Sequence, residues 1–265
     1  MLMMLATLAQ KQPYDVYAIR YATIPGFKVS ELIEGADPAR RIDLAMMVWL
    51  IRGNGRNVLV DSGFYRPSIF KKWKINPFVR PDEAVARAGV KPDDVTDVIL
   101  THAHWDHAGG ADLFPKARIW IQKDEYQYYT VDAWKPEGKH AGIEHEDMDF
   151  LERANKEGRL RLVDGDQEIL PGIRVYVGGR HTYQSQYVSV AAKPGTIVLS
   201  SDNMYLYENL EKHVPIAQTF DAKSNLAAQD RMKTIASKPS LIVPGHDPLV
   251  MTRFPRVAEG VVRIE

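Results

Sequence analysis

The chain has 265 residues, 45% of them hydrophobic and 26% charged, with 34 basic residues, 34 acidic residues and no cysteine. Such a composition is typical of a globular protein with a sizeable core. The absence of cysteine excludes disulfides, thiolate zinc ligands and thiol nucleophiles, and the zero net charge argues against nucleic acid or an anionic membrane as the main partner.

The chain begins with an apolar stretch, Met1 to Ala9, which carries no basic residue and is short for a signal sequence. We expect residues 1–12 to be flexible, with the remnant of a signal sequence or a partner-binding arm as alternatives. No apolar run reaches the roughly 18 residues of a membrane span, so a soluble protein is expected. A cytoplasmic location is favoured, and a secreted or periplasmic one is left open.

Three strands rich in valine, isoleucine, tyrosine and tryptophan are predicted near the N-terminus: Tyr14 to Thr23, Ala45 to Arg52 and Asn57 to Val60. Asn54-Gly55 has the composition of a tight hairpin turn between the second strand and the third. The long connection that follows, Phe64 to Pro81, interleaves aromatic and basic residues. We predict that it is a flap over an active site or a dimer contact, because long loops are commonly functional.

The densest group of polar residues follows a predicted buried strand, Val95 to Leu100. A short helix from Pro81 to Ala88 precedes that strand. The polar residues lie within six positions and are His102, His104, Asp106 and His107. Neutral imidazole and carboxylate are the ligands that suit zinc and similar divalent metals. The pattern therefore predicts a metal site where the strand ends and the chain turns into a helix.

The middle of the chain continues with a strand, Arg118 to Gln122, and two helices, Lys123 to Tyr129 and Glu146 to Lys156. The irregular insert between these helices contains His140 and His145. Neither histidine fits a ligand pattern, and we predict that both lie on the surface. The alternative is that one of them contacts the substrate.

The remaining strands are short and are punctuated by glycine and proline. They are Leu160 to Val163, Ile173 to Val177, Tyr187 to Ala191, Ile197 to Ser200 and Leu241 to Val243. A helix is predicted from Ser224 to Ser237, with Ser224 as its N-cap. No linker or repeat interrupts the chain, so we expect one domain over residues 1–265. The strands fall into two groups, each followed by helices, which favours two packed sheets with helices outside.

The sequence from His102 to His107 resembles the signature His-x-His-x-Asp-His of the metallo-β-lactamase superfamily. The resemblance implies a mixed α/β (α+β) fold, a four-layer αββα sandwich, with two metal ions at one edge of the sheets. It also implies three further ligands. The matching residues each follow a predicted strand and are His181, Asp202 and His246.

The resemblance divides the ligands between two ions bridged by Asp202, with a water or hydroxide between them. The sets are His102, His104 and His181 for one ion and Asp106, His107 and His246 for the other. Zinc is the expected metal because every ligand atom is nitrogen or oxygen; iron, manganese and cobalt are alternatives. Asp61, in an Asp-x-Gly similar to an early motif of the superfamily, is expected to hold a ligand imidazole through its other nitrogen. The alternative is a plain turn residue.

A tyrosine three residues after the bridging carboxylate, Tyr205, resembles the N-acyl-homoserine lactonase group. In that group the phenol hydrogen-bonds the substrate carbonyl or the leaving oxygen, so the resemblance makes Tyr205 and Asp106 the catalytic candidates. The alternative is that Tyr205 only packs in a helical turn. The absence of cysteine excludes the branch with a cysteine ligand. His104 stands where the diiron oxygen reductases have a carboxylate, which argues for hydrolysis.

The leading hypothesis is a dinuclear hydrolase that opens lactones, in particular N-acyl homoserine lactones (quorum quenching), by attack of a metal-bridging hydroxide. A thioesterase similar to glyoxalase II, an esterase or a phosphotriesterase is the alternative on the same site. A metal-binding scaffold without turnover is the alternative from another class. The expected partner is a small lactone or ester, and a homodimer is left open.

Overall fold

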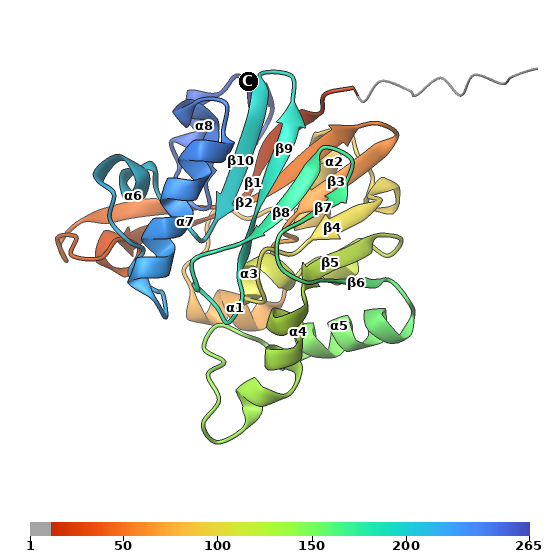
Figure 1. The fold of residues 1–265 in the computed structure, drawn as a ribbon, viewed down its shortest axis with the longest axis horizontal. Helices are drawn as coiled ribbons and strands as arrows, with labels where there is room; N and C mark the ends of the chain where they lie inside the picture. Colours follow the sequence, from red (N-terminus) through yellow and green to blue (C-terminus); the bar gives the residue numbers. More distant parts are fainter. Residues whose placement is uncertain (1–11) are drawn as a thin grey trace, which may run out of the picture.

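The computed structural model describes residues 12–265, and its strands form two sheets (Figure 1). The larger sheet has eight strands in the order β12-β13-β1-β2-β3-β4-β5-β6, and the smaller has five in the order β11-β10-β9-β8-β7. The predicted flexible start falls on residues 1–11, which lie outside the described residues, and on residue 12. Within residues 12–265 no helix has the length and apolar character needed to cross a membrane.

The larger sheet joins antiparallel strands β12, β13, β1, β2 and β3 to parallel strands β4, β5 and β6. Asn54 and Gly55 form the two-residue turn between β2 and β3, and both have positive φ angles, 50° and 71°, as a tight hairpin turn requires. The bounds are β1 (Asp15–Lys28), β2 (Arg41–Gly53), β3 (Arg56–Val60), β4 (Asp97–Ile99), β5 (Arg118–Gln122), β6 (Leu160–Val163), β12 (Arg256–Ala258) and β13 (Val261–Arg263).

The smaller sheet is antiparallel except for β11, which runs parallel to β10. The sequence pattern does not predict β7, β12 or β13, because each has only three or four residues and is partly exposed. Pairing makes these segments strands: β7 pairs with β8, β13 with β1, and β12 with β13. The bounds are β7 (Gln167–Leu170), β8 (Ile173–Val177), β9 (Gln186–Ala192), β10 (Gly195–Ser201) and β11 (Ile242–Pro244).

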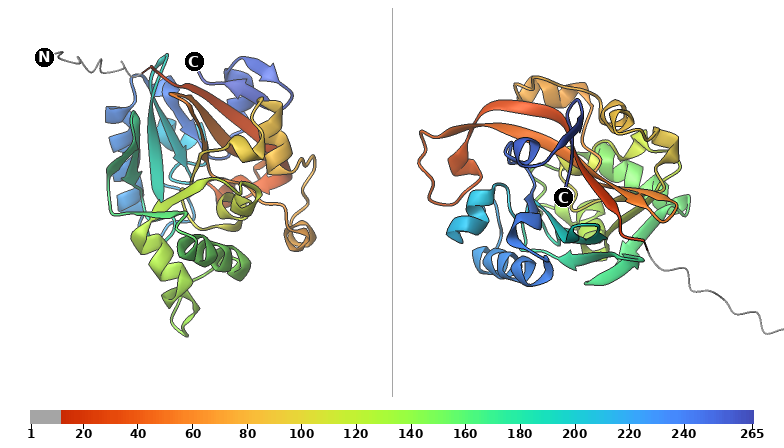
Figure 2. Two further views of the ribbon diagram at one scale, coloured as in Figure 1. Left: turned by 90° about the vertical axis from the view of Figure 1, so that its right-hand side faces the viewer. Right: turned by 90° about the horizontal axis from the view of Figure 1, so that it is seen from above.

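Alternation of side chains along the strands gives each sheet an inner face and an outer face. In β2, Trp49 packs between the sheets in one core with Val188 of β9, whereas Leu50 lies in the core on the opposite face, under helices. On the far side, Met232 of a helix packs with Val198 of β10. These cores separate four layers, helix–sheet–sheet–helix, which confirms the predicted αββα sandwich (Figure 2).

The helices that cover the larger sheet are α1 (Pro67–Lys72), α2 (Pro81–Arg87), α3 (Trp105–Ala108), α4 (Lys123–Thr130) and α5 (His145–Lys156). The others are α6 (Tyr207–Lys212), α7 (Ala222–Ile235) and α8 (Val250–Arg253). Short 3₁₀ turns occupy Val29–Glu31, Pro92–Asp94, Ala111–Leu113, Asp132–Trp134 and Pro239–Leu241.

The predicted N-cap of the helix α7 is wrong. The carboxylate of Asp221 accepts hydrogen bonds from the backbone N–H groups of Lys223 and Ser224, at 3.1 and 3.2 Å. Ser224 lies inside the first turn, where its hydroxyl donates to the Asp221 carbonyl at 2.9 Å. The helix therefore starts at Ala222, two residues earlier than predicted, because an aspartate satisfies two of the free N–H groups at its start.

Candidate metal centre

The seven predicted ligands come from distant parts of the chain and lie together where four strands end. His102 and His104 follow β4, which leads into the helix α3. His181 follows β8, Asp202 follows β10 and His246 follows β11. Their ligand atoms gather into two groups, which we name the first and the second ligand group. The first is His102, His104 and His181 with Asp202, and the second is Asp106, His107 and His246.

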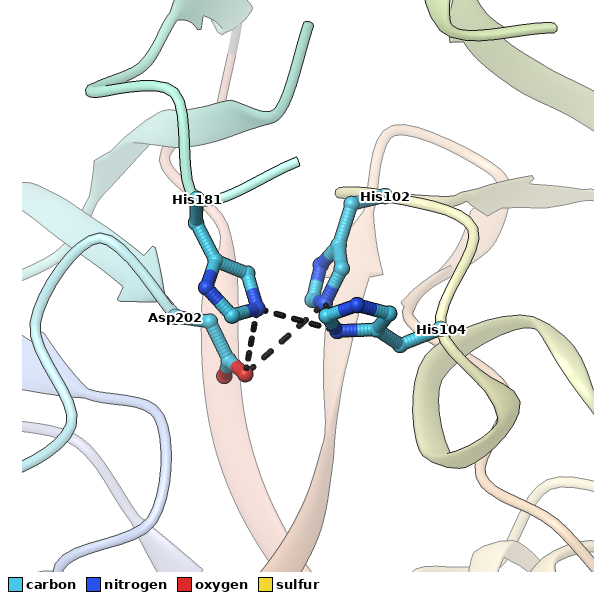
Figure 3. A group of neighbouring side chains, drawn as sticks. All are labelled: His102, His104, His181 and Asp202. Carbon is cyan, nitrogen blue, oxygen red and sulfur yellow. Dashed lines mark hydrogen bonds and ion pairs between the residues drawn. The ribbon is translucent and has the colours of Figure 1, made fainter. Parts of the chain in front are cut away.

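In the first ligand group three imidazole nitrogens point at one another (Figure 3). Nδ1 of His104 lies 3.0 Å from Nε2 of His102 and 2.9 Å from Nε2 of His181. Oδ2 of Asp202 completes the group, 3.3 Å from Nε2 of His181 and 3.7 Å from Nε2 of His102. Three nitrogens and one oxygen around a common point are a donor set that suits zinc.

The second ligand group faces the other oxygen of Asp202. Oδ1 of Asp202 lies 3.3 Å from Nε2 of His107 and 3.0 Å from Nε2 of His246. Oδ2 of Asp106 lies 3.4 Å and 3.7 Å from the same two nitrogens. Asp202 thus presents one oxygen to each group, which is the arrangement expected of a bridging carboxylate.

Hydrogen bonds on the far side of the rings orient the ligand histidines. Nδ1 of His181 lies 2.7 Å from the Gln218 carbonyl, and Nδ1 of His246 lies 2.9 Å from the Ala45 carbonyl. A carbonyl only accepts, so each Nδ1 carries the proton and each Nε2 turns a lone pair toward its group. Asp61 lies 2.8 Å from Nδ1 of His107 and orients that ring in the same way, as the sequence predicts.

Two buried atoms of the site lack a hydrogen-bond partner among the described residues: Nε2 of His107 and Oδ1 of Asp202. Nδ1 of His107 faces Asp61, so its Nε2 is left to act, like Oδ1 of Asp202, as a ligand atom. A cation between these two atoms satisfies both. The side chains therefore fit divalent ions held by nitrogen and oxygen donors.

The two ligand groups differ in electrostatics. Burial lowers the pKa of His102 well below its usual value and lowers that of His104 to about 3, so both rings are neutral. Burial acts in the same direction on His107 and His246, but the negative charges of Asp202 and Asp106 together outweigh it and raise the pKa of both. The second ligand group therefore attracts positive charge more strongly than the first.

Two buried side chains hold the loops that carry the ligands, and neither is predicted from the sequence. Glu125 of α4 accepts hydrogen bonds from the backbone N–H of Ala103, at 3.0 Å, and of Gln184, at 2.7 Å, so it joins two loops of the first ligand group. The Asn203 side chain accepts from the N–H of Gly179, at 2.6 Å. A glutamate in a polar helix is typical of a surface position, and only the tertiary packing buries this one.

Tyr205 lies beside the ligands and is 4% exposed. Its hydroxyl oxygen is 3.4 Å from Nδ1 of His181, which already donates to the Gln218 carbonyl, so the phenol hydrogen remains free for another acceptor. Burial and the nearby charge of Asp202 raise its pKa well above the usual value. Tyr205 is therefore a neutral hydrogen-bond donor at physiological pH.

A cavity of about 230 Å³ opens onto the site, with Tyr205, Asp106, His246 and Asp202 among its polar lining. The large apolar side chains in its lining, named here the apolar wall, are Ile24, Phe27, Leu32, Leu44, Met46, Trp73 and Trp105. Trp73 belongs to the predicted flap, so that segment lies over the cavity. The alternative role of Phe64 to Pro81, a contact between the subunits of a dimer, stays a prediction.

A second cleft, of about 550 Å³, approaches the first ligand group from another side and includes His104 and His181 in its lining. Lys139, His140 and Phe220 also line it. His140 and His145 are both exposed and stack on Trp134, with ring centroids 4.3 and 3.4 Å from the indole. The surface location predicted for both histidines is confirmed, and His140 is the one beside the site.

Comparison with known protein families gives one match, over residues 44–246, to the metallo-beta-lactamase superfamily. This range contains all seven predicted ligands and Asp61. Among characterised proteins the chain is similar to the N-acyl homoserine lactonase AiiA of Bacillus thuringiensis subsp. kurstaki. The two are 26% identical over 226 residues, which cover 79% of this chain and 84% of the relative.

Solved structures show the same fold. A quorum-quenching N-acyl homoserine lactone lactonase superposes with a TM-score of 0.75 at 24% identity, over 94% of this chain and 98% of that one. AidC, a dizinc quorum-quenching lactonase, superposes with a TM-score of 0.70 at 16% identity, over 90% and 89% of the two chains. At these identities the likeness concerns the fold alone.

Proposed function

The chain belongs to the metallo-beta-lactamase superfamily, and from this premise we propose that it is a metal-dependent hydrolase that opens the ester ring of lactones. The substrates proposed are N-acyl homoserine lactones, as the names of the similar lactonases suggest. The observation that carries the proposal is the bridging position of Asp202 between two complete ligand groups, with Tyr205 beside them.

The first and second ligand groups would each hold one ion, with zinc as the expected metal. Bound divalent ions supply a water acidic enough to act as a nucleophile near neutral pH, and they polarise a carbonyl. Asp202, Asp61 and the carbonyl of Ala45 hold the ligand rings in place before substrate arrives. Little reorganisation is then required during the reaction.

Hydrolysis joins a water oxygen to the ring carbonyl carbon, breaks the bond from that carbon to the ring oxygen, and leaves a carboxylic acid and an alcohol. Tyr205 is proposed to donate its free hydrogen to the carbonyl oxygen or to the leaving oxygen as negative charge develops there. Its raised pKa keeps the phenol protonated for this role. Asp106 is proposed to act as a ligand at the mouth of the cavity, where it is half-buried.

The apolar wall supports a substrate that carries a hydrocarbon chain. Leu44, Met46 and Trp105 lie in the same lining as Tyr205 and Asp202, so a chain attached to the ring can remain in contact with apolar surface. Burial of apolar surface contributes roughly 0.8 kcal/mol per methylene. Acyl lactones are therefore proposed to bind more tightly than the bare ring.

The proposal is tested by measuring the hydrolysis of a panel of substrates by the zinc-loaded protein. The panel contains N-acyl homoserine lactones, unsubstituted lactones, aryl esters, acyl thioesters and phosphotriesters. The expected result is the highest kcat/KM for the acyl lactones. A higher value for a thioester or a phosphotriester would replace lactone opening by that activity on the same site. A fully loaded protein that turns over none of them would support a metal-binding scaffold.

A further inference from the structure

Each ligand histidine has one ring nitrogen that faces away from the other ligands. In four of the five, this nitrogen has a hydrogen-bond partner. The partners are a side-chain oxygen for His102 and His107 and a backbone carbonyl for His181 and His246. His104 is the exception. It turns Nδ1 rather than Nε2 toward the cluster, and within residues 12–265 no hydrogen bond to its Nε2 is found.

The ring of His104 is instead packed against Gly142, in the insert between the helices α4 and α5. A methyl carbon added to Gly142 would lie 2.9 Å from Cδ2 of His104 and 3.2 Å from its Nε2. Atoms of this kind do not approach so closely, so the ring and a side chain at position 142 exclude each other. Gly142 also has a φ of +78°, which a residue with a side chain adopts only with strain.

The main chain fixes Gly142 relative to its neighbour in the ligand motif. Its carbonyl accepts a hydrogen bond of 2.9 Å from the backbone N–H of Trp105, the residue directly after His104. The carbonyl of His104 in turn accepts from the N–H of Ala108 in the first turn of α3. The backbone of Gly142 is therefore hydrogen-bonded to the segment that carries His104. This bond fixes the position of the glycine relative to the imidazole.

We propose that Gly142 is a positioning residue for His104: its bare α-carbon forms the wall that keeps the imidazole turned with Nδ1 into the first ligand group. This inference rests on the metal centre proposed above. A side chain at position 142 displaces the imidazole ring. The affinity for the ion bound by His102, His104 and His181 then falls. The ion of the second ligand group, which does not use His104, keeps its ligands.

A zinc titration of the metal-free protein with a competing chelator tests this role without any measurement of activity. The variant is Gly142→Ala, and the matched control is Gly158→Ala. Gly158 has a φ of +70°, and an added methyl carbon there would meet nothing within 4 Å. Both substitutions thus introduce similar backbone strain, but only the first touches a ligand.

The expected result is two zinc ions of unchanged affinity in the wild type and in Gly158→Ala. In Gly142→Ala the affinity for one of the two zinc ions falls by about 10- to 100-fold, the usual effect of disturbing a group that orients a ligand. Both metal-free variants should unfold at a lower temperature than the wild type, because each places a side chain at a positive φ. Unchanged zinc affinity in Gly142→Ala, or equal weakening in both variants, overturns the inference.

Two further results separate the possible failures. A wild type that never binds two zinc ions overturns the proposed metal centre, and the inference with it. If Gly142→Ala does not fold, the contact is measured in the wild type by nuclear Overhauser effects between the Gly142 α protons and the His104 ring proton on Cδ2. The effects should be present in metal-free and zinc-loaded protein, and their absence in both overturns the inference.

Discussion

The two ligand groups share Asp202 but are supported by different parts of the fold. In the second group, His107 is held by Asp61 at the end of β3, and His246 is held by the carbonyl of Ala45 inside β2. In the first group, His181 is held by the carbonyl of Gln218, which lies in a loop, and His104 packs on Gly142 of the insert. His107 and His246 are therefore held by residues of the larger sheet, whereas His104 and His181 are held by loops.

The difference extends to charge and to the space around the ligands. The carboxylates raise the pKa of His107 and His246, whereas burial lowers that of His102 and His104. The cavity with the apolar wall includes Asp106 and His246 of the second group and His104 of the first in its lining, whereas the second cleft includes His104 and His181 of the first. We expect the second ligand group to be the tighter and more rigid ion site, because sheet residues and negative charge support it.

Removing Asp202 should impair both ligand groups and so remove the difference between them, because each group loses a ligand. In Asp202→Ala we expect kcat/KM for acyl lactones to fall by roughly three powers of ten or more, together with loss of zinc. His140→Ala and His145→Ala serve as controls, since both side chains are exposed and neither belongs to a ligand group. Comparable losses in all three variants would mean that the site is misplaced.

Tyr205 lies between the two groups, with its ring 5.6 Å from that of His181 and 5.8 Å from that of His246. Tyr205→Phe keeps the ring and removes only the donor, so zinc content and stability should barely change. We expect kcat/KM for lactones to fall by about one to three powers of ten.

The loss in Tyr205→Phe should be smaller for aryl esters, whose leaving group needs little protonation. Full lactonase activity in the variant would contradict the proposed role. An equal loss on every substrate together with lost zinc would show that Tyr205 acts through packing.

Asp61→Asn should weaken zinc binding at the second ligand group more than at the first. Asp61 contacts the His107 ring directly, whereas it reaches His102 only through the Thr101 hydroxyl. The substitution removes the charge that orients His107, and we expect the zinc affinity of one site to fall by about 10- to 100-fold. Asp97→Asn is the matched control: Asp97 is equally buried, at the start of β4, and pairs with Arg56 and Arg118.

The Asp97→Asn variant should lose stability but keep both zinc sites. Titration of each metal-free variant with zinc and a competing chelator distinguishes the two aspartates. Zinc affinities that fall together at both sites in Asp61→Asn would argue against separate support for the two ligand groups.

The smallest expected effect concerns the cavity with the apolar wall. Trp73→Ala removes part of the apolar wall, so KM should rise about ten-fold more for a decanoyl than for a butanoyl homoserine lactone. Trp134→Ala is the control, because Trp134 is likewise half-buried and stacks on histidines outside the cavity. A rise that does not depend on chain length would place the acyl chain elsewhere.

Much of the candidate site follows from the sequence because ligand chemistry is a local property. Imidazole and carboxylate side chains directly after apolar runs predict ligands at strand ends, and the structure brings all seven together. Strands with strong apolar patterns, such as β2 and β5, are predicted for the same reason. The αββα layers follow from the resemblance and from the grouping of the strands.

Tertiary structure alone decided how the ligands are held. The distribution of the two Asp202 oxygens between the groups depends on where β10 lies relative to β4 and β11. The burial of Glu125 and the close contact of Gly142 with His104 each join segments that are distant in sequence. No local pattern encodes these contacts, because each depends on atoms that meet only after the two sheets and the loops between them have packed.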